Sequence, residues 1–153
     1  MWRIVYFIPL LPFISGWLLL LITEQFFALS LVNGFAQLAL FAIVVCLPTW
    51  RTRRMSFVDI GWPWGITLIG VLTWMYGEGD NIRGAIISIA YIFAGGRMGL
   101  GAIKLLISGH LDKELPRYEF QKKRWSKAGK KNTALAMQIE AILQGLANAS
   151  FLA

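Results

Sequence analysis

Long apolar runs with few charges alternate with short polar stretches along this chain of 153 residues. Most of the runs reach the ~18–20 residues that a helix needs to cross the hydrocarbon core of a bilayer. The apolar residues are continuous instead of falling at every second position, which favours helices over the strands of a membrane barrel. The pattern predicts an all-α fold: a polytopic transmembrane helix bundle forming a single domain, 1–153, with about five membrane helices at about 4–22, 26–47, 57–76, 84–108 and 132–153.

A polar, basic stretch at 109–131 separates the fourth and fifth predicted spans. Pro116 suits the first position of a helix, because its missing N–H has no partner there in any case. The stretch therefore predicts a short interfacial helix whose lysines and arginines attract anionic lipid headgroups. An alternative is that it forms the rim of a pocket for an anionic cofactor.

The fifth predicted span is the most polar of the five. Glu140, Gln144 and Asn148 recur every four residues and so share one face of a helix. That face must turn toward protein or water instead of lipid. The alternative is an amphipathic helix lying on the membrane surface, but such helices usually carry Lys or Arg on the polar face, and none follows Lys131. The absence of these cations favours a span.

Composition and charge agree with a membrane protein. Hydrophobic residues make up 57% of the chain and charged residues 15%, against about 25% charged in soluble domains. The net charge of +7 could indicate nucleic-acid binding, but the basic residues flank apolar spans, which is how membrane proteins set their topology. We therefore expect the lipid bilayer, and not nucleic acid, as the partner.

The distribution of Lys and Arg predicts the orientation. With the amino terminus inside, the inner segments hold twelve of them (one at position 3, three at 51–54 and eight at 113–131), while the outer loops hold only Arg83. Basic loops stay on the cytoplasmic side. The chain is therefore predicted to lie in a bacterial inner membrane with a cytoplasmic amino terminus.

Charged residues inside the predicted spans are the first candidates for a site, because charge is costly there unless it is paired or hydrated. Arg97 lies roughly 20 Å from the outer end of its span at 1.5 Å per residue. Glu140 and Asp59 lie at a similar depth on two other spans. Together with Gln144 they predict an intramembrane polar network. It would be either a pocket open to the cytoplasm or a structural ion pair that locks three helices together.

Other catalytic and metal-binding chemistry finds no support in the sequence. The chain has one cysteine, Cys46, and one histidine, His110. Neither has the neighbours of a metal site or of a nucleophile–base pair. No metal is predicted.

Three short motifs together resemble a known family. They are DIGWPWG at 59–65, RMGL at 97–100, and ELPRY at 114–118 followed by Trp125. In this order and spacing they resemble an uncharacterised bacterial membrane family related to the steroid 5-alpha-reductase carboxy-terminal domain. Gln144 falls where that family often has a glutamine. The positions that match the family motifs are Trp62, Gly65, Gly99, Pro116, Arg117, Tyr118 and Trp125.

The resemblance implies NADPH-dependent reduction of an activated double bond in a lipid-like substrate. Residues 1–153 resemble only the amino-terminal half of such a reductase, and the family's cofactor-binding signature lies in the other half. We therefore expect no cofactor in this chain alone, and NADPH if a carboxy-terminal half or a partner is present. The alternative is a non-catalytic accessory or structural subunit that packs against a larger membrane complex, so the sequence leaves the enzyme question open.

Overall fold

Helices make up the secondary structure of the part of the chain described by the computed structural model, residues 11–77, 80–129 and 132–152, and no strand occurs within those ranges. The all-α prediction is confirmed. The α-helices are α1 (Leu11–Ile22), α2 (Glu24–Phe41), α3 (Leu47–Thr52), α4 (Val58–Tyr76), α5 (Asn81–Ile107), α6 (Pro116–Lys127) and α7 (Thr133–Ala149). A π-helical turn, Ala42–Cys46, joins α2 to α3, and a 3-10 turn, Ser150–Leu152, follows α7.

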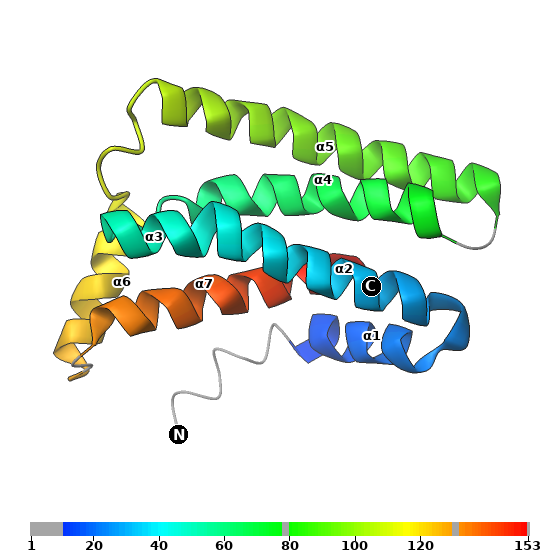
Figure 1. Cartoon of the computed structure of the whole chain (residues 1–153), viewed down its shortest axis with the longest axis horizontal. Coiled ribbons are helices and arrows are strands. Elements are labelled where there is room, and N and C mark those ends of the chain that lie inside the picture. Colours follow the sequence, from blue (N-terminus) through cyan, green and yellow to red (C-terminus); the bar gives the residue numbers. More distant parts are fainter. Residues whose placement is uncertain (1–10, 78–79, 130–131, 153) are drawn as a thin grey trace.

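The long helices lie side by side along the long axis of the molecule, and successive ones run in opposite directions (Figure 1). α5 forms one edge and makes its extensive helix contact with α4. α4 and α7 in turn pack on α2, and α1 packs on α2 as well. α6 crosses one end of the bundle, beside the start of α7 (Figure 1).

The helix at the second predicted span, 26–47, is longer than predicted. The helix continues from Glu24 through Pro48 to Thr52. The reason is the π-helical turn, since a wider turn adds a residue and interrupts the regular hydrogen-bond ladder. Pro48 therefore falls at the start of α3, where its missing N–H costs no bond. The helix ends at Arg53, which adopts a left-handed backbone conformation.

Helices occupy the other predicted ranges, with small shifts at their ends. α4 matches 57–76 to within one residue, and α6 begins at Pro116 as predicted. α5 begins three residues before position 84, because the Asp80 side chain accepts a hydrogen bond from the N–H of Arg83 at 2.8 Å and caps the helix there. Positions 4–10 of the first predicted span and position 153 of the last lie outside the described residues.

Two helical stretches, Glu24–Thr52 and Asn81–Ile107, are long and apolar enough to cross a membrane. α7 has 17 residues and the described part of α1 has 12, so both are shorter than a typical span. α4 has 19 residues, but it carries Asp59 in its first turn and Pro63 in its interior, and it is not among the helices that meet both criteria. Length and composition thus support two of the predicted spans.

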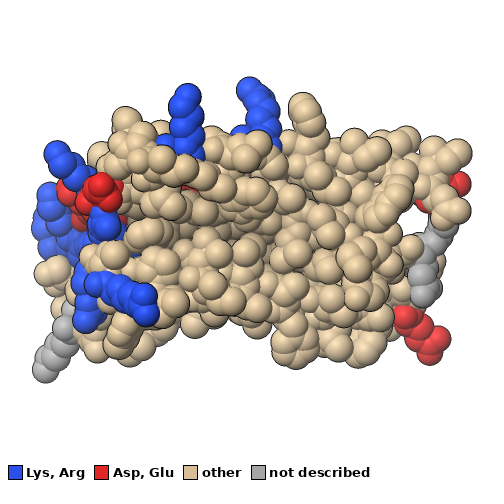
Figure 2. All heavy atoms as spheres, turned by 45° about the horizontal axis from the view of Figure 1, so that its top comes forward, with Lys and Arg blue, Asp and Glu red and all other residues tan. Residues whose placement is uncertain are grey.

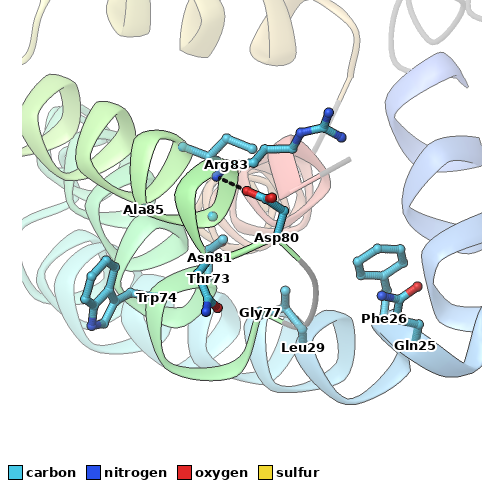
Figure 3. A pocket seen from close by; sticks show the side chains of 12 residues that line it. Gln25, Phe26, Leu29, Thr73, Trp74, Gly77, Asp80, Asn81, Arg83 and Ala85 are labelled. Atoms are coloured by element: carbon cyan, nitrogen blue, oxygen red, sulfur yellow. Dashed lines mark hydrogen bonds between the residues drawn. The ribbon is translucent and has the colours of Figure 1, made fainter.

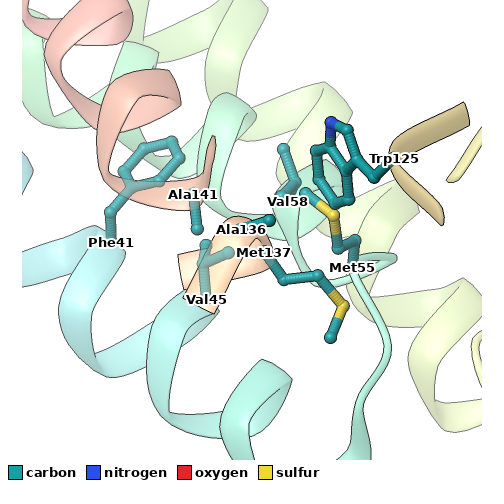
Figure 4. Packing of buried hydrophobic residues seen from close by; sticks show 8 residues of the cluster. All are labelled: Phe41, Val45, Met55, Val58, Trp125, Ala136, Met137 and Ala141. Carbon is teal, nitrogen blue, oxygen red and sulfur yellow. The ribbon is translucent and has the colours of Figure 1, made fainter. Parts of the chain in front are cut away.

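The main apolar core lies near the α6 end of the bundle. Figure 4 shows Trp125 of α6 and Met55 of the α3–α4 linker meeting side chains of the π-helical turn, α4 and α7. Because α6 contributes an almost fully buried tryptophan, burial of apolar surface holds it against the bundle. The buried residues of this cluster are Phe41, Val45, Met55, Val58, Trp125, Ala136, Met137 and Ala141.

Close backbone contact joins α5 to α4 at Gly95. A Cβ atom placed there would lie 2.5 Å from the backbone nitrogen of Thr67 and 2.7 Å from the carbonyl oxygen of Pro63. Only glycine permits two helices to approach this closely. Gly96, the next residue, has no neighbour within 4 Å of such a Cβ.

We expect Gly95→Ala to destabilise the fold by about 1–3 kcal/mol, because the added methyl group meets backbone atoms that cannot move aside. Gly96→Ala is the matched control and should stabilise α5 by up to about 1 kcal/mol through its better helix propensity. Thermal unfolding of the detergent-purified proteins, followed by circular dichroism, measures both. Equal melting temperatures for the two variants would show that α4 and α5 do not approach each other in this way.

Candidate functional site

The carboxylate of Glu114 joins two segments that are far apart in sequence. It accepts hydrogen bonds from the N–H groups of Met55 at 3.0 Å and Ser56 at 3.1 Å, and from the Ser56 hydroxyl at 2.8 Å. The Lys122 ammonium of α6 forms an ion pair with it. The two N–H groups belong to the turn that leads into α4, where backbone donors lack helical partners. Glu114 therefore fastens the α5–α6 loop to the start of α4.

The Glu114 side chain is only 9% exposed, and its environment favours the ionised form. Burial by itself raises the pKa of a carboxyl group. Hydrogen bonds from the Lys122 ammonium, the Met55 N–H and the Ser56 hydroxyl outweigh burial and place the pKa of Glu114 below its ordinary value. The group is therefore a permanent anion at neutral pH.

Asp59, on the first turn of α4, is held by two neighbours on α6. The Tyr118 hydroxyl donates to its Oδ1 atom at 2.8 Å, and Arg117 forms an ion pair with the same oxygen. Burial, reinforced by the negative charge of Asp59, raises the pKa of Tyr118, so the phenol stays protonated and donates. Burial lowers the pKa of Arg117, but Tyr118 and Asp59 raise it by more, which keeps the guanidinium charged.

Arg97 does not pair with Asp59 or Glu140, as the predicted network required, whereas the predicted neighbours Glu140 and Gln144 do meet. Arg97 is exposed, on the side of α5 that faces away from the bundle, and makes no hydrogen bond or ion pair with another residue in the described ranges. Asp59 pairs with α6 instead, and Glu140 accepts a hydrogen bond from Gln144 at 3.2 Å. The physical reason is rotation about the helix axis. Residues at similar depth meet only if their side chains also point toward each other.

The polar face of α7 turns inward, as predicted. Gln144 accepts a hydrogen bond from the indole N–H of Trp62 on α4 at 2.8 Å and donates one to Glu140 on its own helix. Asn148 is fully buried and donates to the Trp62 carbonyl at 3.0 Å. These bonds hold α7 against α4.

A second group of buried amides was not predicted. Asn33 and Gln37 of α2 are fully buried; Asn33 donates to the Ala149 carbonyl at 2.9 Å and Gln37 to the Gly65 carbonyl at 2.8 Å. Two polar residues four apart in an apolar span were the available signal, since they share one helix face. The side-chain oxygens of Gln37 and Asn148 are buried without a hydrogen-bond partner among the described groups.

Gly65 leaves room for these amides. A Cβ at this position would lie 2.1 Å from Asn148 Nδ2 and 2.5 Å from Gln37 Oε1. The helices α2, α4 and α7 therefore meet through polar side chains that converge on one glycine. Such hydrogen bonds between helices hold bundles together where water is absent.

The remaining motif positions also lie in contacts between elements. Gly99 of α5 faces the indole of Trp64, which a Cβ there would approach to 2.9 Å. Trp125 is buried in the main apolar core, and Pro116 begins α6. The motifs thus mark residues that position α6, α5 and α7 relative to α4.

A pocket of about 550 Å³ opens at the opposite end of the bundle (Figure 3). Gln25 and Phe26 of α2, Trp74 of α4 and Arg83 of α5 are among its lining residues. The carboxylate of Asp80 caps α5 through the Arg83 N–H, as the dashed line in Figure 3 shows. Across the described ranges, no three His, Cys, Asp or Glu residues gather as metal ligands.

Comparison with models of known protein families found no match to this chain, and searches of curated proteins and of solved structures found none either.

The low pKa of Glu114 makes the fold sensitive to acid. The carboxylate contributes its full stability above the unfolded-state pKa, about 4.3, and loses it as the pH falls through the lower folded-state pKa. We expect Glu114→Gln to destabilise the protein at pH 7 and to flatten the fall in melting temperature between about pH 5 and pH 3. Glu119→Gln, at an exposed position on α6, is the control. The same acid profile for Glu114→Gln and wild type would contradict this role.

Proposed function

We propose that this chain is an integral membrane protein in which α1, α2–α3, α4, α5 and α7 cross the bilayer. The main support is its apolar outer surface. Only 22% of the most apolar 18-residue segment of α5 is buried within the bundle. Soluble monomers rarely expose apolar patches larger than a few hundred Å². Lipid would cover this surface. Large exposed hydrophobic residues include Phe35, Ile43, Trp74, Ile82, Ile86, Ile89, Phe93 and Leu100.

Charge supports one orientation. Figure 2 shows Lys and Arg gathered at the end of the molecule where α6 lies, while much of the surface between the ends carries no charge. Arg51, Arg53, Lys123 and Lys127 are exposed in this region. In the proposed arrangement this end faces the cytoplasm of a bacterial cell, because basic segments stay on that side. The exposed lysines of α6 then lie at the level of anionic headgroups.

We propose further that the bundle is the membrane-embedded half of a reductase-like unit. The support is spatial: motif residues that carry the resemblance meet across long stretches of sequence, as in the Asp59–Arg117 and Trp62–Gln144 contacts. The residues that carry the resemblance are therefore neighbours in space, although they are distant in sequence. In this proposal, NADPH-dependent reduction of a lipid-like substrate requires a carboxy-terminal half or a partner chain.

The second candidate is an accessory subunit of a larger membrane complex. The observation that favours it is the exposed Arg97 on the outer face of α5. A charge at bilayer depth facing away from its own bundle is expensive unless another molecule pairs with it.

The orientation can be tested by labelling single cysteines in a Cys46→Ser background. We expect Lys123→Cys on α6 to be protected from a membrane-impermeant maleimide in intact bacteria, and Glu24→Cys in the α1–α2 hairpin to react. Both residues are exposed, so access to the reagent and not burial decides the result. Labelling of both sites from the same side would contradict the proposed topology.

Residues 1–153 purified alone should show no saturable NADPH binding in the micromolar range in a fluorescence titration, because the family's cofactor signature lies outside the part that they resemble. Micromolar binding would contradict the proposed division of labour. Native mass spectrometry of the complex extracted from membranes separates the two candidates. A co-purifying chain with NADPH-consuming activity supports the reductase-like unit, and a complex without that activity supports the accessory subunit.

A further inference from the structure

α5 has two faces of different character. Its inner face carries Gly95 and Gly99, which pack against α4. Arg97 lies two residues from each of them, and residues two apart are separated by about 200° around a helix of 3.6 residues per turn. Arg97 therefore points directly away from the bundle, in agreement with its exposure.

Small and basic residues form a straight stripe along this outer face. The spacing alternates between four and three residues, which keeps the stripe on one line of the helix. Large apolar side chains flank it on both sides: Ile87, Met98 and Leu105 on one side are 40–48% exposed, and a row on the other side is 63–81% exposed. Ala90, Ala94 and Gly101 have smaller side chains than their neighbours on either side, and the pattern repeats every seven residues. We call this face the groove, because a helix surface with a low line of small residues is one against which another helix packs. The stripe consists of Ala90, Ala94, Arg97, Gly101 and Lys104. The more exposed flanking row consists of Ile86, Phe93, Leu100 and Ile107.

The two cations in the groove differ in depth. Lys104 is three residues from the inner end of α5, so its long side chain reaches the membrane surface. Arg97 is ten residues from that end and sixteen from the other, about 15 Å and 24 Å along the axis. With a hydrocarbon core about 30 Å thick, Arg97 lies well inside the bilayer. Figure 2, which brings the α5 side forward, shows basic side chains on a largely uncharged surface.

We propose that this groove docks a membrane helix of a partner chain that carries a carboxylate facing Arg97. The proposal rests on the proposed membrane insertion and names the partner that the bundle requires. Arg97 needs an anion at its own depth, and an aspartate or glutamate on a packed helix supplies one. Ala94 and Gly101 keep the floor of the groove low on either side of Arg97, so the second backbone can come close enough for the ion pair.

Two other occupants fit this face less well. Lipid phosphates lie at headgroup level, which suits Lys104 but not the deeper Arg97. A second copy of the chain would bring the same basic groove against itself, and like charges at close range repel. Only a partner with the opposite charge satisfies Arg97 within the core.

A pair of synthetic membrane peptides can test the proposal. Each is a leucine–alanine helix of about 24 residues, long enough to span the core, with either Glu or Leu at its centre. The full chain, labelled at Glu24→Cys in the Cys46→Ser background, is reconstituted in phosphatidylcholine vesicles. Association with each acceptor-labelled peptide is measured by energy transfer. We expect the Glu peptide to bind at least about tenfold more tightly than the Leu peptide.

Matched variants identify the groove. Arg97→Leu should abolish the preference for Glu, whereas Arg83→Leu, also exposed on α5, should retain it. Arg97→Glu should instead prefer a peptide with a central Lys. Gly101→Leu should weaken binding of the Glu peptide by raising the floor of the groove, while Gly96→Leu, which lies off the stripe, should not.

Several outcomes would overturn the proposal. Equal binding of the Glu and Leu peptides removes the ion pair. An effect of Arg97→Leu that requires added phosphatidylglycerol and is independent of the peptide assigns the face to a lipid headgroup. If labelled copies of the chain show energy transfer to one another and Arg97→Leu abolishes it, the face serves self-association instead. Maleimide labelling of Glu24→Cys and Lys123→Cys in the same vesicles tests membrane insertion separately from docking. Failure to span the bilayer overturns the proposed function as well, whereas spanning without a Glu preference overturns the docking alone.

Discussion

The position of α6 depends on one buried carboxylate. Glu114 binds the N–H groups of Met55 and Ser56 and pairs with Lys122, so the start of α4, the loop after α5 and α6 itself share one anion. Once α6 is held there, its other side chains find their partners on α4 and α7, including the buried Trp125. Removing a charge that satisfies several buried donors leaves all of them unpaired, which costs more than the loss of any single bond.

The interior of the bundle is more polar than its outer surface would suggest. Asn33, Gln37 and Asn148 are fully buried between α2, α4 and α7, while large apolar side chains cover the outside. In water, apolar side chains on the outside would contribute no hydrophobic stabilisation. In lipid, the outer surface needs no covering, and hydrogen bonds between helices hold the bundle together. Gly65 makes room for the amides, so a single small residue allows three helices to be joined at one level.

The two faces of α5 differ in what they contact. Gly95 and Gly99 bring its inner face against α4, and Arg97 lies on the opposite side. An inward Arg97 could have paired with Asp59 or Glu140, whereas in the proposed membrane arrangement an outward one needs an anion from another molecule. Both carboxylates have other partners: Asp59 accepts from Tyr118, and Glu140 accepts from Gln144.

The sequence by itself determined the helices and most of their ends, because apolar runs, Pro116 and the polar spacing of α7 act locally. It also indicated that the polar side of α7 turns inward. Only the tertiary structure decided which charges pair. Asp59 and Arg117, which pair, are 58 positions apart in the sequence. The prediction that Arg97 pairs with Asp59 used only the depth of each residue along its helix and ignored the direction in which each side chain points. Local periodicity specifies where a residue lies on its own helix, but the partner it meets depends on how several helices turn toward one another, and packing alone sets that rotation.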